Sequence, residues 1–291
     1  MRTETYSTPG PLLLNLEIPA GEIEIETSNG DETQIELEAI SKNDAVRDLV
    51  DNSRIELIKR GDGHEVVVEA KSRQGIFISL SRGPDIRFGG PDVRLRITGP
   101  AGADLDVRTK SADLRAHGEY GGVELQTASG DLQLDEARGA VRIKTASGDV
   151  RLGRAQTSLE VQSVSGDLHV DSVGGDLRAQ LVSGDVHVRD ARGSIGANTV
   201  SGDQRFEAVL RGRVELKAIS GDVTVGIRSG ARVFVDANTV SGSTNSELEL
   251  GDAPAQEPTP DSPLVEVFAK TVSGDVLIAR APALVEATEQ S

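Results

Sequence analysis

"VSGDLHVDSVGGDLRAQLVSGDVHVRD", residues 164–190 of this 291-residue chain, contains a Ser-Gly-Asp turn that returns after eighteen residues. Serine occupies the same place at 111, 129, 147, 165, 183 and 201, and the later turns follow at intervals of 19, 21 and 32 residues. So strict a period indicates one structural unit that stacks on copies of itself.

Each eighteen-residue unit divides into two nonapeptides, such as "VSGDLHVDS" and "VGGDLRAQL". Apolar residues alternate within each half, as in half-buried strands, and the alternation changes phase between halves, as at a bend. Antiparallel hairpins would also show alternating apolar residues. However, similar residues recur at a spacing of eighteen as well as nine, which favours parallel coils that stack like side chains on one another. We therefore predict an all-β fold, a parallel β-solenoid of about nine 18-residue two-strand coils. We expect the valines that flank the turn, Val182 and Val186, to lie in the core.

The chain divides into three regions on this interpretation. Residues 1–100 form an N-terminal β cap, residues 101–282 form the solenoid repeats, and residues 283–291 form a polar tail. The segment "NDAVRDLVDN", 43–52, predicts one short helix in the cap, because Asn and Asp favour helix starts. Residues 243–263 are rich in proline and acid and predict a mobile insertion in the repeats.

Composition limits the classes of partner. The net charge is −16, from 47 acidic and 31 basic residues, and nucleic acids and anionic membranes both require a basic face. There is no cysteine, so disulfides and thiolate metal sites are excluded. The start of the chain lacks a signal-peptide pattern, and no apolar run approaches the roughly 20 residues of a membrane span. We expect a cytoplasmic protein without a membrane span, surface-associated only if it is exported by another route.

Three segments carry a resemblance to a known family. They are "TPGPLLLNLEIPAGEIEIETS" at 8–28, "GGVELQTASGDLQL" at 121–134 and "LVEVFAKTVSGDVLIAR" at 264–280. In this order they resemble the bacterial β-strand-repeat family labelled "putative adhesin", a domain of unknown function common in actinobacteria. The resemblance spans nearly the whole chain. It implies a β-solenoid-like fold and supplies no catalytic residues.

The aspartates of the turns would stack in one column about 5 Å apart. This column contains Asp131, Asp149, Asp167, Asp185, Asp203 and Asp222. One interpretation is structural: Gly takes a positive φ, and the Ser and Asp side chains accept backbone N–H bonds. The alternative is a cation-responsive repeat that binds calcium through these carboxylates. Calcium takes about six to eight oxygen ligands, and one Asp per coil supplies few of them, so we favour the turn and expect no cofactor.

The sequence offers little to catalysis. His169 and His187 are eighteen residues apart and should be vertical neighbours, but Arg151 and Arg205 occupy the adjoining ladder positions. Such arginines would repel a metal ion. We predict that the protein is not an enzyme, with a polysaccharide-acting β-helix enzyme as the remote alternative.

The loop at 72–92 is the candidate for a partner-binding surface. It concentrates base and aromatic side chains in an acidic, aromatic-poor chain, a composition enriched in interface cores. The candidate residues are Arg73, Phe77, Arg82, Arg87 and Phe88. The alternative is that this loop simply caps the first coil. The function predicted from the sequence is a non-catalytic structural or interaction module, scaffold or adhesin-like, for an unidentified protein or for self-association.

Overall fold

The computed structural model describes residues 1–41, 44–70, 93–248 and 262–281. The chain forms two units, Met1–Gln156 and Thr157–Ser291, and each is built from parallel two-strand coils. The prediction of an all-β parallel solenoid is therefore confirmed. The proposed boundary between residues 100 and 101 stays a prediction.

Unit 1 combines a β cap with the first coils. Its elements are β1 (Arg2–Ser7), β2 (Leu12–Ser28), β3 (Glu32–Ala39), α1 (Asp44–Asp51), β4 (Arg54–Arg60), β5 (Gly63–Glu69), β6 (Val93–Pro100), β7 (Asp104–Tyr120), β8 (Val123–Thr127), β9 (Leu132–Ala137), β10 (Val141–Ser147) and β11 (Val150–Ala155). Strand β2 runs along both faces of its coil, and one of its edges pairs with β7. Its other edge pairs with β5 in the first part of the strand and with β6 in the second part. The predicted helix is present as α1, and its Val46, Leu49 and Val50 are buried.

Tyr120 is one of the largest buried side chains in the core of unit 1. Its ring is fully buried, and its hydroxyl lies 2.9 Å from the carbonyl oxygens of both Ile25 and His117, to which it can donate. Burial raises the pKa of Tyr120 well above its ordinary value. The folded protein therefore holds this phenol in its neutral form.

Alkaline pH should destabilise unit 1 through Tyr120. The unfolded chain ionises this phenol near pH ~10 and the folded chain does not, so its contribution is complete below that pH and is lost as the pH rises further. We expect Tyr120→Phe to cost about 1 kcal/mol at pH 7 and to flatten the fall in stability above pH ~10. Urea unfolding at neutral and alkaline pH measures both effects. An unchanged alkaline slope in the variant would contradict the assignment.

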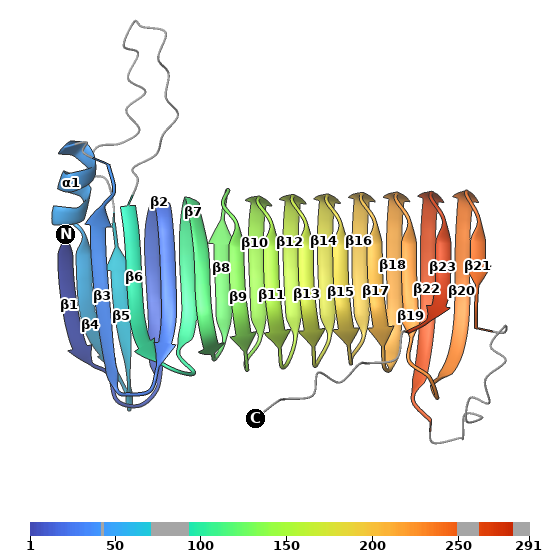
Figure 1. The fold of residues 1–291 in the computed structure, drawn as a ribbon, viewed down its shortest axis with the longest axis horizontal. Helices are drawn as coiled ribbons and strands as arrows, with labels where there is room; N and C mark the ends of the chain where they lie inside the picture. Colours follow the sequence, from blue (N-terminus) through green and yellow to red (C-terminus); the bar gives the residue numbers. More distant parts are fainter. Residues whose placement is uncertain (42–43, 71–92, 249–261, 282–291) are drawn as a thin grey trace, which may run out of the picture. The chain divides into compact units, whose positions relative to one another are not determined.

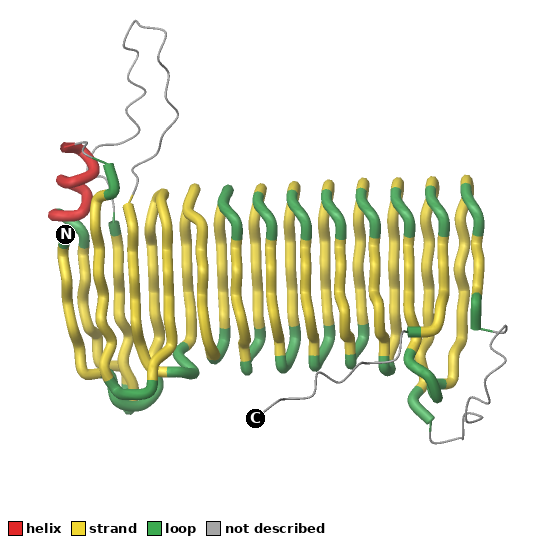
Figure 2. The backbone as a smooth tube through the Cα atoms, in the orientation of Figure 1, coloured by secondary structure: helices red, strands yellow, loops and turns green. Residues whose placement is uncertain are grey.

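Unit 2 consists of regular coils. Its strands are β12 (Leu159–Ser165), β13 (Leu168–Val173), β14 (Leu177–Ser183), β15 (Val186–Ala191), β16 (Ile195–Ser201), β17 (Gln204–Val209), β18 (Gly212–Ser220), β19 (Val223–Ile227), β20 (Arg232–Ser241), β21 (Thr244–Ser246), β22 (Leu264–Ser273) and β23 (Val276–Arg280). Even-numbered strands through β18 form one face and odd-numbered strands through β19 form the other, in parallel register at one coil per step. Short loops join the two faces at each corner (Figure 2).

The last coils of unit 2 do not stack in chain order. Strand β22 pairs with β18 on one edge and with β20 on the other, and β23 lies in the same way between β19 and β21 (Figure 1). The C-terminal coil is thus an interior coil, and the coil of β20 and β21 is the end coil. The stacking order of these last coils therefore departs from their order in the chain. The segment predicted as an insertion from residue 243 also begins with strand β21.

The inserted strand β22 keeps two carboxylates apart, although it also places Lys270 opposite Lys217. Phe268 of β22 lies opposite Glu215 of β18 on one side and Asp236 of β20 on the other. Direct pairing of β20 with β18 in the same register would bring these two carboxylates face to face, and like charges directly opposite one another destabilise a sheet. The inserted coil separates them with an aromatic ring.

Candidate functional site: an exposed apolar edge

An apolar row runs along one corner of unit 2. We call it the valine edge, and in spatial order it comprises Val164, Val182, Val200, Ile219, Val272 and Val240. Each residue directly precedes the serine of a turn. Between 44% and 54% of each residue is exposed, except for Val240, which is 83% exposed. Contiguous exposed apolar surface of this kind marks an interaction site more often than an isolated exposed side chain does.

The expectation that Val182 lies in the core is therefore wrong, whereas Val186 is buried as predicted. Strand β14 turns Leu177, Ala179 and Leu181 inward, so the next residue, Val182, faces outward. The bend at Gly184, where φ is 132°, resets the alternation before Val186.

Among the described residues of unit 1, this corner carries no such row of large apolar side chains. The equivalent positions, directly before Ser111, Ser129 and Ser147, hold Lys110, Ala128 and Ala146. The same corner is thus built in both units, but β-branched residues occupy it only from residue 164 onward. The backbone of the turn does not require valine at this position, since Ala128 and Ala146 precede the same Ser-Gly-Asp turn.

The aspartate column beside the edge is a hydrogen-bond ladder. The Oδ1 atom of each aspartate accepts the backbone N–H of the turn in the next coil. In unit 2 these bonds join Asp167 to Asp185, Asp185 to Asp203, Asp203 to Asp222, Asp222 to Asp275 and Asp275 to Ser243, at 2.7–2.8 Å. In unit 1 Asp113 accepts from Asp131, and Asp131 from Asp149. Backbone dipoles thus compensate the stacked charges.

The carboxylates serve the corner in this way, as the structural interpretation predicts. Within the described ranges, no group of three or more His, Asp or Glu side chains is placed to hold a metal ion. Calcium binding by the column stays a prediction, and thermal melts with calcium and with a chelator test it.

We expect Asp185→Ala to lower the stability of unit 2 by about 1 kcal/mol, because the N–H of Asp203 loses its acceptor. Asp185→Asn is the matched control, since its amide oxygen can still accept and one repulsive charge is removed. It should be neutral or slightly stabilising in thermal melts. The same melts with calcium and with a chelator should coincide for the native chain. A calcium-dependent rise that Asp185→Asn removes would instead establish the cation hypothesis.

Other polar side chains in the repeats also have structural partners. Thr145 and Ser163 donate to the carbonyl oxygens of Ser147 and Ser165 in their own turns, at 2.9 and 3.1 Å. The rings of His169 and His187 are neighbours, as predicted, with centroids 5.6 Å apart. His187 lies beside Arg205 in the ladder, and its Nε2 is 2.8 Å from Glu207 Oε1.

The predicted partner-binding residues Arg73, Phe77, Arg82, Arg87 and Phe88 lie outside the described residues. The sequence pattern missed the valine edge, although its signal was present. Six β-branched residues recur directly before the turn serines, and counting the alternation from the strand alone places them outside.

A protein-family comparison gives one match: the family described as Toastrack DUF4097 matches residues 14–279. No curated protein matches the chain significantly. Similar solved structures include the following three. A putative adhesin from Bacteroides fragilis is 13% identical, covers 95% of this chain and 96% of its own, and has a TM-score of 0.43. A putative lipid binding protein from Parabacteroides distasonis is 12% identical, with coverage of 96% of both chains and a TM-score of 0.37. A putative cell adhesion protein from Clostridium sporogenes is 10% identical, covers 96% and 99%, and has a TM-score of 0.23.

Among the described residues, no helix is long and apolar enough to cross a membrane.

Proposed function

The chain belongs to the Toastrack DUF4097 family, and for this member we propose a non-catalytic function: it docks a partner protein along the valine edge of unit 2. The observation that carries the proposal is the edge itself. It holds six of the exposed large apolar side chains found in the described residues, in one uninterrupted row.

The surroundings of the edge have the composition of an interface rim. A row of outward polar side chains runs parallel to it, two residues earlier in each strand, and comprises Gln162, Gln180, Asn198, Lys217, Lys270 and Asn238. Exposed turn serines line the other side. An apolar centre between polar margins is the usual anatomy of a protein–protein interface.

The regular spacing supports a flat, repetitive partner surface. Successive members of the edge are one strand spacing apart, about 4.8 Å, and are held by a continuous backbone ladder. A rigid row of this kind loses little conformational entropy on binding. A partner segment with apolar side chains along one side would contact several coils at once.

A non-catalytic role is also supported by what the polar groups of the repeats do. The turn aspartates accept backbone N–H bonds, and arginines on the faces pair with carboxylates, for example Arg189 with Asp171 at 3.0 Å and Arg213 with Glu215 at 2.6 Å. These side chains stabilise the coils.

Site-specific photo-crosslinking in the producing cell tests the proposal. We expect a photoreactive residue at position 182 to yield a covalent adduct of defined mass. The same residue at position 128, the equivalent corner of unit 1, should yield none. Introducing Val200→Asp should abolish the adduct at 182, whereas Ala146→Asp should leave it intact. Equal adducts at 182 and 128, or none at 182, would contradict docking along the edge.

A further inference from the structure

The end coil of unit 2 leaves a strand edge open. Strand β20 is ten residues long and pairs with β22, and among the described residues no strand pairs with its opposite edge. The N–H of Arg232 bonds the carbonyl of Pro263, so alternation along the strand directs the backbone groups of Val233, Val235, Ala237 and Thr239 toward the open edge. Such a row of unpaired donors and acceptors is a template for another strand.

The core is also uncovered at this end. Val233 and Val235 face inward, opposite Val265 and Val267 of β22, which are fully buried. Val233 and Val235 themselves remain 37% and 36% exposed. They line an open groove of about 450 Å³ together with Ile227, Ala231 and Leu248.

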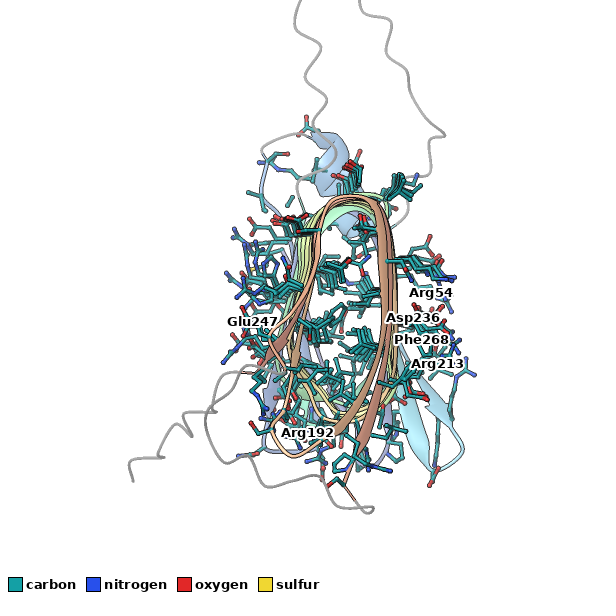
Figure 3. The ribbon with its side chains drawn as sticks, turned by 90° about the vertical axis from the view of Figure 1, so that its right-hand side faces the viewer. Arg54, Arg192, Arg213, Asp236, Glu247 and Phe268 are labelled. Carbon is teal, nitrogen blue, oxygen red and sulfur yellow. The ribbon has the colours of Figure 1, made fainter. Side chains whose placement is uncertain are left out.

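Aromatic stacking on the outer face also stops at the end coil. The Arg213 guanidinium lies 4.3 Å from the centroid of the Phe268 ring, and the Phe234 ring lies 5.8 Å from that of Phe268. Figure 3 shows Arg213, Phe268 and Asp236 together on this face, with Glu247 on the opposite one. Phe234 is 53% exposed and ends the series.

The outer strand and the helix of unit 1 protect its cap by the usual devices. Helix α1 buries three apolar side chains there, and the outer strand β4 presents Arg54, Glu56 and Arg60. Charged side chains of this kind discourage edge-to-edge pairing. Strand β20 instead reads "RVFVDANTVS", with one acidic residue and one basic residue.

We propose that two copies of the chain associate end to end through antiparallel pairing of β20 with β20 about a twofold axis at Ala237. In this register the outward backbone groups of Val235 meet those of Thr239 in the second copy, and Phe234 lies opposite Val240. This register places the most exposed aromatic side chain of the end coil opposite its most exposed valine, and aromatic–β-branched pairs stabilise sheets. Asp236 lies opposite Asn238, which can donate to its carboxylate.

Other registers are less favourable. An axis at Asp236 would oppose two carboxylates, and an axis at Phe234 would leave half of β20 without a strand opposite. With the axis at Ala237, residues 233–241 of the two copies lie opposite one another along their whole length. Because the interface is isologous, every favourable pair occurs twice. This surface is distinct from the valine edge except at Val240, so the two proposals can fail separately.

Cysteine pairing tests the register in the full chain, which has no cysteine of its own. Phe234 and Val240 would form a non-hydrogen-bonded antiparallel pair, whose short Cα separation suits a disulfide. We expect a mixture of the Phe234→Cys and Val240→Cys variants to yield a covalent dimer under mild oxidation. Each variant alone should not, because its own cysteines would lie roughly 20 Å apart in the dimer. Both positions are exposed, so thermal melts should match those of the native chain.

Sedimentation of the native chain over a wide concentration range should show a reversible dimer, and Phe234→Lys should weaken it at least tenfold. Three outcomes would overturn the proposal. One is a monomer at all concentrations. The second is equal cross-linking of the single variants and the mixture. The third is amide protection of Val235 and Ala237 in a monomer, which would show that the chain covers its own edge.

Discussion

Gly202→Ala should lower the free energy of unfolding of unit 2 by about 3 kcal/mol. Gly202 has a φ of +138°, which residues with side chains rarely adopt, and a Cβ there would lie 2.1 Å from the carbonyl oxygen of Gly184 in the preceding coil. The residue after Gly202 is also tied to this neighbouring coil, by the hydrogen bond from the Asp203 N–H to Asp185. Urea unfolding at 25 °C, followed by circular dichroism, measures the loss.

Gly196→Ala is the matched control, because Gly196 belongs to the same coil. A Cβ at this position meets nothing within 4 Å. Alanine in a strand also restricts the unfolded chain more than glycine does, so stability should be unchanged or higher by up to about 1 kcal/mol. Equal losses from the two substitutions would show that the corner geometry does not determine the stability of the coil.

Ending the chain at residue 261 should destabilise unit 2 further, by roughly 5 kcal/mol or more. This removes β22 and β23, whose Val265, Val267, Val276 and Ile278 are fully buried. It also removes the strands that pair with β20 and β21. Residues 232–246 should therefore lose their amide protection in hydrogen exchange, although they remain in the chain.

A chain ending at residue 281 is the control, because it keeps both strands and should melt like the full chain. The informative contrary result is retained protection of residues 232–246 in the chain that ends at 261. It would mean that β20 pairs directly with β18, despite the approach of Asp236 to Glu215.

Periodicity made the coil predictable. The eighteen-residue spacing and the alternation of apolar residues suffice for two parallel strands per coil, because stacked coils must place like residues in register. The short helix at 43–52 was also predictable, from the Asn and Asp at its start. The family resemblance, which is confirmed, was visible in the same repeats.

The valine edge was predictable in principle and was missed for a geometric reason. Val182 and Val186 are four residues apart, and in an uninterrupted strand they would share a face. The positive φ of Gly184 breaks the strand between them, so the alternation must be counted from Leu181 alone. A bend changes the meaning of the sequence pattern on each side of it.

The order of the last coils could not be predicted from the repeat. All coils carry the same turn, so the motif does not determine whether β22 stacks beyond β20 or between β18 and β20. The difference lies in cross-strand neighbours, such as Phe268 between Glu215 and Asp236, which become visible only once the strands are paired. The open edge of β20, and with it the dimer proposal, follows from that order.

The inserted C-terminal coil also constrains how the gene can change. In most solenoids, duplicating the final repeat adds a coil to the outer end. Here such a duplication would add a second copy of an interior coil, between strands that already pair with the first copy. Between residues 159 and 210 the coils stack in the order of the chain. Duplications there would lengthen unit 2 and leave its end coil unchanged. Length variation among relatives should therefore be concentrated in the middle of the repeats.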